Sequence, residues 1–345
     1  MAIVSNYQFG QLLTAAVARR EKVIQDIVHN STPLTNILKD KGRIQTKRAG
    51  GPELRIPVQF DKLTAQWFTG YDKIQITPRE LVNSAVYNWS RVVAPFSLNG
   101  TEILFTGGVE EQIDLVSFYL RDAEKAVGEE FELGIISDGT GQGGRQMIGL
   151  GAAIPITPNT GTYGGIDRAT VPNWRTSTFN IVSGDVAGFN TWDSTTARPI
   201  INRIALQRSR NGRYADLLIA DALAYEAIDA SLVAHQRIVE DGGSTNRMTK
   251  VGSLGFTALQ LMTAAGPVNI VAAGGIGNVM PANTIFGIDT EGLSIYEFPG
   301  QSFVPFHPGD GVRPVNQDAI AQGIVWSGQM VLENPLFSYR IRTTA

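Results

Sequence analysis

The sequence contains no cysteine and only three histidines among its 345 residues. The absence of cysteine excludes disulfide bonds, thiolate nucleophiles and cysteine-ligated metal sites. His29, His235 and His307 lie far apart in the chain, and no two of them have the spacing of metal ligands. We therefore expect no metal site and no cofactor, and we expect stability to come from packing and association.

Charged residues are also scarce, because they make up 18% of the chain and the net charge is −3. A surface with few charges is poorly protected against association. This composition fits a surface covered by neighbouring copies, and it fits equally a sheet-rich protein with uncharged polar side chains outside. The net charge excludes a polycation that grips nucleic acid. Only residues 1–50 are mildly basic, with eight Lys and Arg against three acidic residues.

Long apolar runs are missing as well. No stretch approaches the ~18–20 apolar residues of a membrane span, and the start of the chain lacks the basic-then-apolar pattern of a signal peptide. We expect no membrane partner and a protein made in a cytoplasm-like compartment.

Signatures of catalysis are weak. The Gly-x-Ser-x-Gly motif of many hydrolases does not occur, although a Ser-His-Asp triad assembled from distant positions stays open. The glycine-rich residues 139–144 follow a predicted helix, and residues 274–278 lack a proper crossover helix behind them, so both are poor nucleotide loops. Turns that need positive φ explain both segments better. Residues 289–292 and 308–311 lack the acidic ladder of a calcium loop, and turn chemistry explains them. We expect no enzyme.

The strongest positive signal is a long amphipathic helix at about residues 109–134. Its apolar positions are spaced four, three, four, three and four apart, at Val109, Ile113, Val116, Leu120, Ala123 and Val127. A helix of about 25 residues is roughly 38 Å long. Glu129, Glu130 and Glu132 crowd its C-terminal end, where acidic residues are unfavourable. This pattern indicates either a basic partner or a solvated face.

An extended hairpin arm is predicted at residues 51–97. Residues 53–60 alternate between apolar and polar side chains, and residues 86–96 form a further apolar strand. The intervening turn contains three aromatic residues, Trp67, Phe68 and Tyr71. Because an isolated hairpin is marginally stable in water, we expect this aromatic turn to bind a partner.

The remaining chain predicts short helices around a compact α/β unit that begins near residue 196. Helices are expected at 7–29, 34–39 and 197–211, and a further helix that Asp221 caps runs to about 233. Strands are expected at 216–220, 268–272 and 284–288, and at 324–326, 330–332 and 337–341. Residues 152–195 are expected to be rich in loops.

Five short motifs in this order resemble the major capsid proteins of tailed bacteriophages with the Hong Kong ninety-seven-like fold. They are TGYDKIQITP at 69–78, SDGTG at 137–141, GGIDRAT with Trp174-Arg175 at 164–175, DLLIAD at 216–221 and VNQDA at 315–319. The resemblance covers about residues 5–342.

The resemblance implies an α+β fold with four parts. These are an N-arm at 1–50, an E-loop hairpin at 51–97, a P-domain at 98–195 and 312–345, and an α/β A-domain at 196–311. The P-domain is expected to hold the long spine helix and a β-sheet. Hexamers and pentamers would close into an icosahedral shell around double-stranded DNA, which they would meet by non-specific proximity. The protein would be part of the virion and would assemble in the host bacterial cytoplasm.

Further partners follow from the same resemblance. A portal at one vertex is implied, and some family members carry a decoration protein. Because the chain begins almost at the arm, we expect a separate or removed scaffolding protein. Two other interpretations stay open: an encapsulin-like nanocompartment shell without DNA, and a soluble α/β enzyme with residues 196–311 as its catalytic half.

Candidate interface residues lie on the hairpin and on the long helix. They are Trp67, Phe68, Tyr71, Lys62, Lys73, Glu129, Glu130 and Glu132. Some relatives lock the shell with a Lys–Asn isopeptide bond, and Lys62, Lys73 and Asn334 have the residue types required. That reaction also needs a buried carboxylate, and no motif here fixes one in place.

Overall fold

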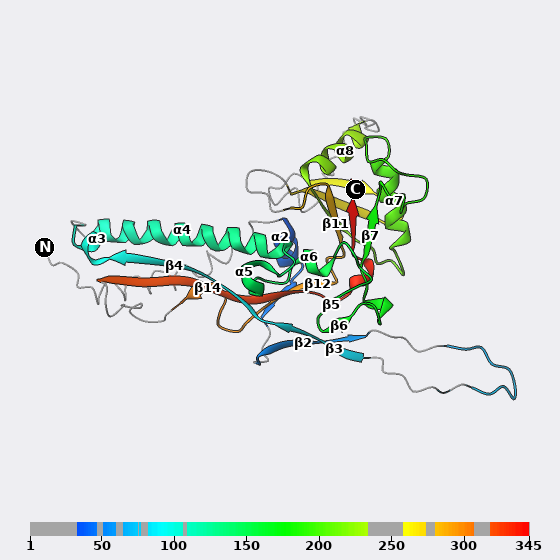
Figure 1. Cartoon of the computed structure of the whole chain (residues 1–345), viewed down its shortest axis with the longest axis horizontal. Coiled ribbons are helices and arrows are strands. Elements are labelled where there is room, and N and C mark those ends of the chain that lie inside the picture. The colour runs from blue at the N-terminus through cyan, green and yellow to red at the C-terminus, as the bar shows by residue number, and fades with distance from the viewer. Residues whose placement is uncertain are drawn as a thin grey trace, which may run out of the picture.

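The computed structural model shows an elongated molecule with three parts (Figure 1). A limb extends to one side, a body carries the C-terminus, and a hairpin arm projects away from the limb. The structure describes residues 33–46, 51–59, 65–74, 76, 82–105, 109–233, 258–273, 280–306 and 318–344. The helices predicted at 7–29 lie outside these residues.

The elements follow one another with short connections. The helices are α2 (Pro33–Asp40), α3 (Gly100–Phe105), α4 (Val109–Ile136), α5 (Gly141–Gly144), α6 (Leu150–Ala153), α7 (Ala197–Gln207) and α8 (Ala222–Val233), with 3₁₀ turns η1 (Pro172–Trp174) and η2 (Pro335–Phe337). The first strands are β1 (Ile44–Thr46), β2 (Glu53–Gln59), β3 (Val82–Asn88), β4 (Ser90–Asn99), β5 (Thr162–Tyr163), β6 (Ile166–Asp167), β7 (Ser177–Asn180) and β8 (Leu217–Ala220). The later strands are β9 (Ala258–Met262), β10 (Pro267–Ala272), β11 (Thr284–Ile288), β12 (Leu293–Glu297), β13 (Val304–Pro305), β14 (Ala319–Leu332) and β15 (Tyr339–Arg342).

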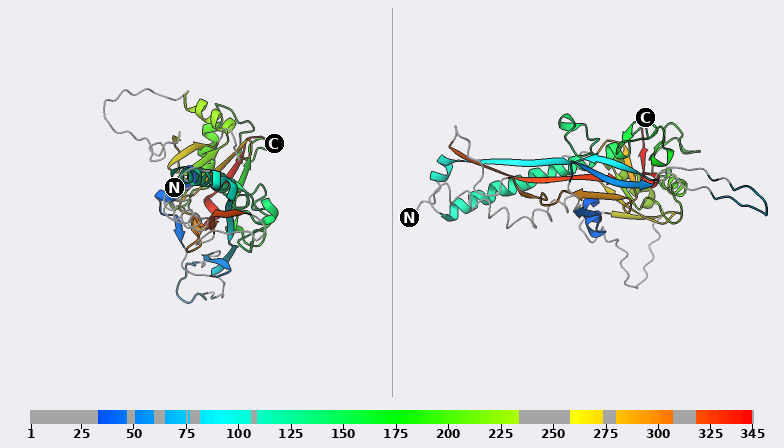
Figure 2. Two further views of the ribbon diagram at one scale, coloured as in Figure 1. Left: turned by 90° about the vertical axis from the view of Figure 1, so that its left-hand side faces the viewer. Right: turned by 90° about the horizontal axis from the view of Figure 1, so that it is seen from below.

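The limb consists of α4 and two long strands. β4 and β14 pair antiparallel along ten residues, and both run beside α4 (Figure 2). The predicted apolar stripe of the helix faces this sheet and continues two turns further than expected. Its buried members are Val116, Leu120, Ala123, Val127, Phe131 and Ile135. The helix prediction is confirmed, and the helix ends at Ile136.

An aromatic cluster fastens the C-terminal half of α4 to the sheet. The ring of Phe131 lies 4.8 Å from Trp326 of β14 and 6.4 Å from Phe303, in edge-on arrangements. All three side chains are buried. Burial of one such side chain contributes about 1.5–3 kcal/mol, so this cluster is a large share of the energy that holds the limb together.

Two larger sheets organise the rest of the molecule. A five-stranded sheet has the order β1-β12-β14-β13, with β4 also paired to β14, and a six-stranded sheet has the order β7-β15-β11-β8-β10-β9. Leu218 of β8 packs in a cluster with α7 and α8, whereas Leu217 packs in the cluster that contains α4. The six-stranded sheet is therefore buried on both faces, which explains its continuous apolar strands. We call this sheet with α7 and α8 the body.

The sheets cross the expected domain boundaries. β12 and β13 lie within 196–311, yet they pair with β14 of the limb. β7 and β15 lie within the range expected for the P-domain, yet they extend the body sheet next to β11. These pairings join residues far apart in sequence, so no local pattern indicates them.

The arm contains β2 and β3, which pair antiparallel from Glu53↔Asn88 to Gln59↔Val82. The alternation predicted for 53–60 is confirmed over the described strand. The single strand predicted at 86–96 is wrong, because the chain bends at Trp89. The indole N–H of Trp89 donates to the carbonyl oxygen of Gly51 at 3.2 Å, and its ring meets Phe298 edge-on at 5.3 Å. These contacts separate β3 of the arm from β4 of the limb.

Two other predictions need correction. The helix expected to run to residue 211 ends at Gln207, because Asn211 and Gly212 adopt positive φ in a tight turn between Arg210 and Arg213. The strands predicted separately at 324–326 and 330–332 belong to the single strand β14.

Candidate assembly surfaces

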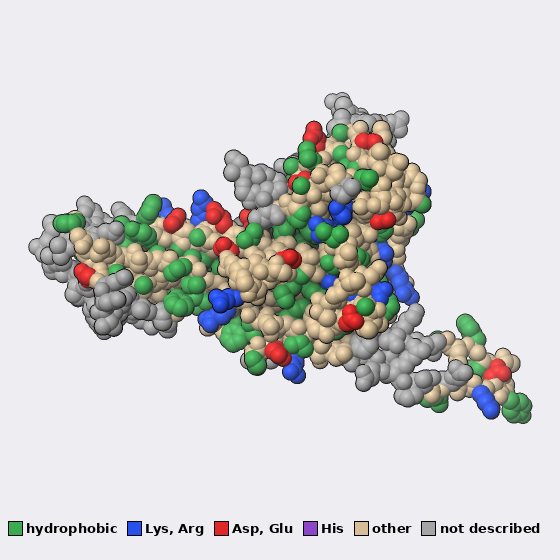
Figure 3. Space-filling model, viewed as in Figure 1, with side chains coloured by type: hydrophobic (Ala, Val, Ile, Leu, Met, Phe, Trp, Pro, Cys, Tyr) green, Lys and Arg blue, Asp and Glu red, His purple; other side chains and the backbone are tan. Residues whose placement is uncertain are grey.

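The arm ends in a turn that exposes three aromatic side chains. Gly70 adopts positive φ, and the backbone N–H of Thr69 donates to Asp72 Oδ2 at 2.9 Å. Trp67 and Tyr71 are fully exposed, and Phe68 is 62% exposed. Aromatic surface of this kind, gathered at one projecting point, is typical of a binding site. Figure 3 shows this tip as hydrophobic groups at the end of the arm.

The two lysines predicted beside the tip have different outcomes. Lys73 is exposed and stands next to Ile74 and close to Ile76, which are also exposed. Lys62 lies outside the described residues. The described part of the tip is therefore apolar with one cationic neighbour.

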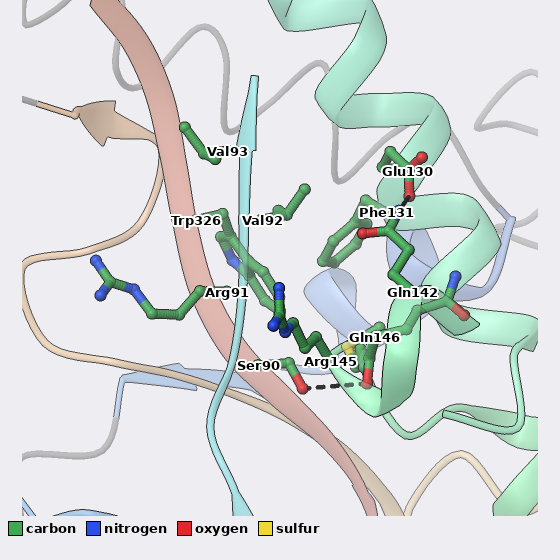
Figure 4. A pocket seen from close by; sticks show the side chains of 12 residues that line it. Ser90, Arg91, Val92, Val93, Glu130, Phe131, Gln142, Arg145, Gln146 and Trp326 are labelled. Atoms are coloured by element: carbon green, nitrogen blue, oxygen red, sulfur yellow. Dashed lines mark hydrogen bonds between the residues drawn. The ribbon is translucent and has the colours of Figure 1, made fainter. Parts of the chain in front are cut away.

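A groove runs along the limb between α4 and β4. It consists of two cavities of about 220 and 240 Å³ that share Val92, Val93 and Glu130. In the first cavity, Phe131 from α4 and Trp326 from β14 point toward each other (Figure 4). The second cavity is lined mostly by apolar side chains, including Ala94, Pro95, Phe96, Ala123, Ala126 and Val127. We call these two cavities the limb groove.

Polar contacts hold the loop beside the limb groove. Gln142 Nε2 donates to Glu130 Oε2 at 3.3 Å, and Ser90 Oγ donates to the carbonyl oxygen of Gln146 at 3.4 Å (Figure 4). Gly143 and its neighbours adopt positive φ. The turn interpretation of residues 139–144 is therefore confirmed.

The three acidic residues at the C-terminal end of α4 have different environments. Glu129 forms an exposed ion pair with Lys125, with 3.8 Å between Oε1 and Nζ, and Glu130 accepts the bond from Gln142. Burial, and then the charge of Glu129, raises the pKa of Glu132. The last turn of α4, which is described throughout, contains no basic residue.

The base of the arm lies on residues 161–175, which we call the arm socket. The backbone N–H of Val86 donates to the carbonyl oxygen of Gly164 at 2.9 Å. The ring of Tyr87 meets Tyr163 edge-on at 5.3 Å. Both tyrosines are almost completely buried, and burial raises the pKa of each. These contacts make the seat of the arm a packed core rather than a loose joint.

The arm socket is tied to the body and the limb by its own hydrogen bonds. Tyr163 Oη accepts from the backbone N–H of Leu332 in β14, and Trp174 Nε1 donates to the carbonyl oxygen of Tyr163, both at 2.9 Å. Arg168 donates to the carbonyl oxygens of residues 152 and 153 at 2.7 and 2.9 Å, and its guanidinium lies 5.1 Å over the Tyr163 ring. Burial lowers the pKa of Arg168. The sequence singled out this segment by resemblance, without predicting its contact with the arm.

A polar network joins the two sheets and was missed by sequence reasoning. Lys41 pairs with Asp216 at 2.6 Å, and Asp216 also accepts from the hydroxyl of Thr290 at 2.6 Å. Arg213 pairs with the buried Asp289 at 2.6 Å. Burial raises the pKa of Asp289, and Arg213 opposes this shift. Residues 289–292 thus form a turn between the sheets, as predicted, and the carboxylate of Asp289 is bound to a cation of its own chain.

Asn334, the candidate acceptor of a crosslink, has a structural contact. Its side-chain oxygen accepts from the backbone N–H of Leu336 at 3.4 Å, at the start of η2. The side chain is only partly buried.

The structure adds little on ligand chemistry. All three histidines lie outside the described residues, as do residues 274–278 and 308–311. Within the described ranges, no group of three or more potential ligands is arranged to hold a metal. No described helix has the length and apolar character of a membrane span.

Comparison with known proteins gives matches only at the level of structure. No protein-family model and no curated protein matches the sequence. The chain is similar to the capsid of cyanophage A-1(L), with 15% identity, a TM-score of 0.61, and coverage of 88% of this chain and 90% of that chain. It is also similar to the capsid of a native GTA particle, with 10% identity, a TM-score of 0.54, and coverage of 88% and 89%. A structure of Mycobacterium phage Bobi matches with 12% identity, a TM-score of 0.50, and coverage of 88% and 89%.

These matches span most of every chain, so the fold as a whole is shared. The chain has the α+β fold of phage capsid proteins, and the expected Hong Kong ninety-seven-like fold is confirmed.

Proposed function

We propose that this chain is a major capsid subunit that assembles with copies of itself into an icosahedral shell. The observation that carries the proposal is the aromatic tip, which is exposed at the end of a long arm in a chain with a capsid fold. We infer that hexamers and pentamers form the shell and that it encloses double-stranded DNA in a virion assembled in the host cytoplasm. On this proposal the chain has no catalytic role.

The positions of tip and groove support assembly in one direction. The tip lies at one end of the molecule, and the limb extends to the opposite end (Figure 1). One subunit therefore cannot place its own tip in its own limb groove. A contact between different surfaces of identical chains is heterologous, and such contacts generate closed rings when the rotation closes. We propose that the tip of one copy docks on the limb of the next.

The chemistry of the two surfaces is compatible. Trp67, Phe68 and Tyr71 are the residue types that anchor protein interfaces, and the limb groove is mostly apolar. Lys73 beside the tip is complementary in charge to Glu130 in the groove. Each buried aromatic side chain contributes about 1.5–3 kcal/mol. A closed shell repeats such contacts at every subunit, so modest pairwise energies give a stable particle.

The three acidic residues at the end of α4 are proposed as a second contact. Glu132 carries a raised pKa because burial and Glu129 disfavour its charge. A basic residue of a neighbouring copy would relieve this. Residues 1–50 carry a net positive charge, so an N-arm formed by these residues is a chemically suitable neighbour.

The parts of the chain receive these roles within the proposal. Residues 51–89 are the E-loop arm, since β4 belongs to the limb. The limb with the five-stranded sheet corresponds to the P-domain, and the six-stranded sheet with its helices corresponds to the A-domain. A portal, a separate scaffolding protein and a decoration protein are expected partners of the complete particle. With a net charge of −3, contact with DNA is expected to be non-specific.

The proposal is tested with the aromatic tip. The variant Trp67→Ser/Phe68→Ser/Tyr71→Ser should remain folded by circular dichroism but fail to form particles in electron micrographs. The control is Leu223→Ser, which removes a similarly exposed apolar side chain from α8 of the body. The wild type and the control should both form shells. Normal shells from the triple variant would refute the arm model.

The same particles test the alternative function of a cargo compartment, which the capsid structures similar to this chain do not favour. Shells from infected cells should contain double-stranded DNA, detected by nuclease protection. Shells that instead enclose an enzyme would support a nanocompartment.

A further inference from the structure

Gly164 in the arm socket lies unusually close to the arm. It adopts φ of +59°, and a Cβ at this position would stand 2.7 Å from Cζ and Oη of Tyr87 and 3.1 Å from Cβ of Ala85. Contacts this short are not tolerated, so any larger residue would push the arm away or distort the socket. The carbonyl oxygen of Gly164 also accepts the bond from Val86. A glycine here thus permits the arm to rest directly on the socket.

Neither side of this contact can yield easily. On the arm, Ala85 and Tyr87 are buried and pair across the hairpin with β2. On the socket, Tyr163, Arg168 and Trp174 are buried and hydrogen-bonded as described above. Close-packed groups of this kind transmit displacement instead of absorbing it. A change at Gly164 should therefore tilt the arm.

We infer that Gly164 and Tyr87 are positioning residues that set the angle of the arm, and through it the curvature of the assembled shell. The second half of this inference rests on the proposed function. Gly70 at the tip lies 16 residues before Val86, since 86 − 70 = 16. At about 3.3 Å per residue this chain length reaches at most about 50 Å. A tilt of about 10° would then move the tip by up to about 9 Å, almost twice the spacing of neighbouring strands.

The next residue provides a matched control. Gly165 also adopts positive φ, at +74°, but a Cβ there would meet nothing within 4 Å. Gly164→Ala and Gly165→Ala therefore impose a similar backbone strain, and only Gly164→Ala adds a collision with the arm. The rescue variant Gly164→Ala/Tyr87→Leu removes the ring atoms that collide.

The angle of the arm is measured first, in the isolated subunit. The chain has no cysteine, so Thr69→Cys at the tip and Leu206→Cys on the exposed face of α7 give one pair of spin labels. We expect the label distance to be equal in the parent and in the Gly165→Ala variant. In the Gly164→Ala variant we expect a shift of about 5–9 Å, as the lever length implies. The rescue variant should return the distance toward that of the parent. An unchanged distance in the Gly164→Ala variant overturns the inference, whether or not any protein assembles.

The curvature is measured second, in full-length chains without labels. Electron micrographs should show particles of one diameter for wild type and Gly165→Ala, and particles of altered diameter or open sheets for Gly164→Ala. Thermal melting of the isolated subunits separates this effect from instability, because the two alanine variants should melt alike. A shifted label distance with unchanged particles refutes the link to curvature. Failure of the wild type to form any particle refutes the proposed function instead.

Discussion

The attachment of the long helix to its sheet can be tested with two phenylalanines of the same helix. Phe131 is 2% exposed and packs on Trp326 and Phe303, whereas Phe118 is 68% exposed. Replacement of a buried phenylalanine by alanine costs about 3–5 kcal/mol, because apolar contacts are lost and a cavity remains. Replacement at an exposed position changes stability by about 0.5 kcal/mol or less. The expected difference between Phe131→Ala and Phe118→Ala is thus about 3–4 kcal/mol.

Urea unfolding is the suitable assay, in the background of the serine triple variant at the tip. Assembly would otherwise add stability that depends on concentration. With a slope of about 3 kcal/mol per molar urea, a loss of about 4 kcal/mol lowers the midpoint by about 1.3 M. Circular dichroism follows the helix, and tryptophan fluorescence follows Trp326.

Equal midpoints for the two variants would refute this account of the limb. They would mean that the cluster around Phe131 does not hold α4 on the sheet. A lowered midpoint only for Phe118→Ala would mean that the helix presents its other face to the sheet.

Three further predictions follow from the charged and polar contacts. Because burial raises the pKa of Glu132, the native state keeps its proton to a higher pH than the unfolded chain, and this stabilisation is lost as pH rises through and above the usual glutamate range; in the tip variant, Glu132→Gln should melt above its parent at pH 7 and equally at pH 3, and a lower melting point at pH 7 would contradict the assignment. A double-mutant cycle with Lys41→Met and Asp216→Asn should give a coupling energy of about 0.5–1 kcal/mol, since the pair is short but partly exposed, and a coupling of zero in urea unfolding would show that the pair does not link α2 to the sheets. Denaturing gel electrophoresis of purified particles should show one band near the monomer mass of 37.3 kDa, because the side chain of Asn334 already caps η2, and a ladder of multiples would show that subunits are crosslinked.

Elements with a local cause were predicted well. The stripe of α4 repeats every three or four residues, and the alternation of β2 repeats every two, so both are visible in short windows. The exposed tip was also predicted, because three aromatics in a turn have no local apolar partner. The bend at Trp89 was missed, since it depends on the distant partners Gly51 and Phe298.

Contacts between distant residues were not predictable from one sequence. Lys41 and Asp216 are 175 residues apart, and nothing in either local sequence indicates the other. The placement of β12 in the limb sheet has the same origin, because strands of similar composition can join either sheet. For the arm socket, a usable signal was present in the adjacent Gly164 and Gly165, which indicated a special backbone conformation. The partner Tyr87 lies more than seventy residues away and had no such signal.

The crossing of strands between the two sheets has a practical consequence for fragments of this protein. A fragment that spans only 196–311 would lack β7 and β15, which cover one side of β11. All five residues of β11 are buried in the intact chain, so the truncated piece would present an apolar, unpaired strand edge to solvent. Such edges recruit other strands and lead to aggregation. A soluble half-molecule would therefore need the C-terminal strand grafted back beside β11, and a simple cut at the domain boundary predicted from the sequence would yield inclusion bodies.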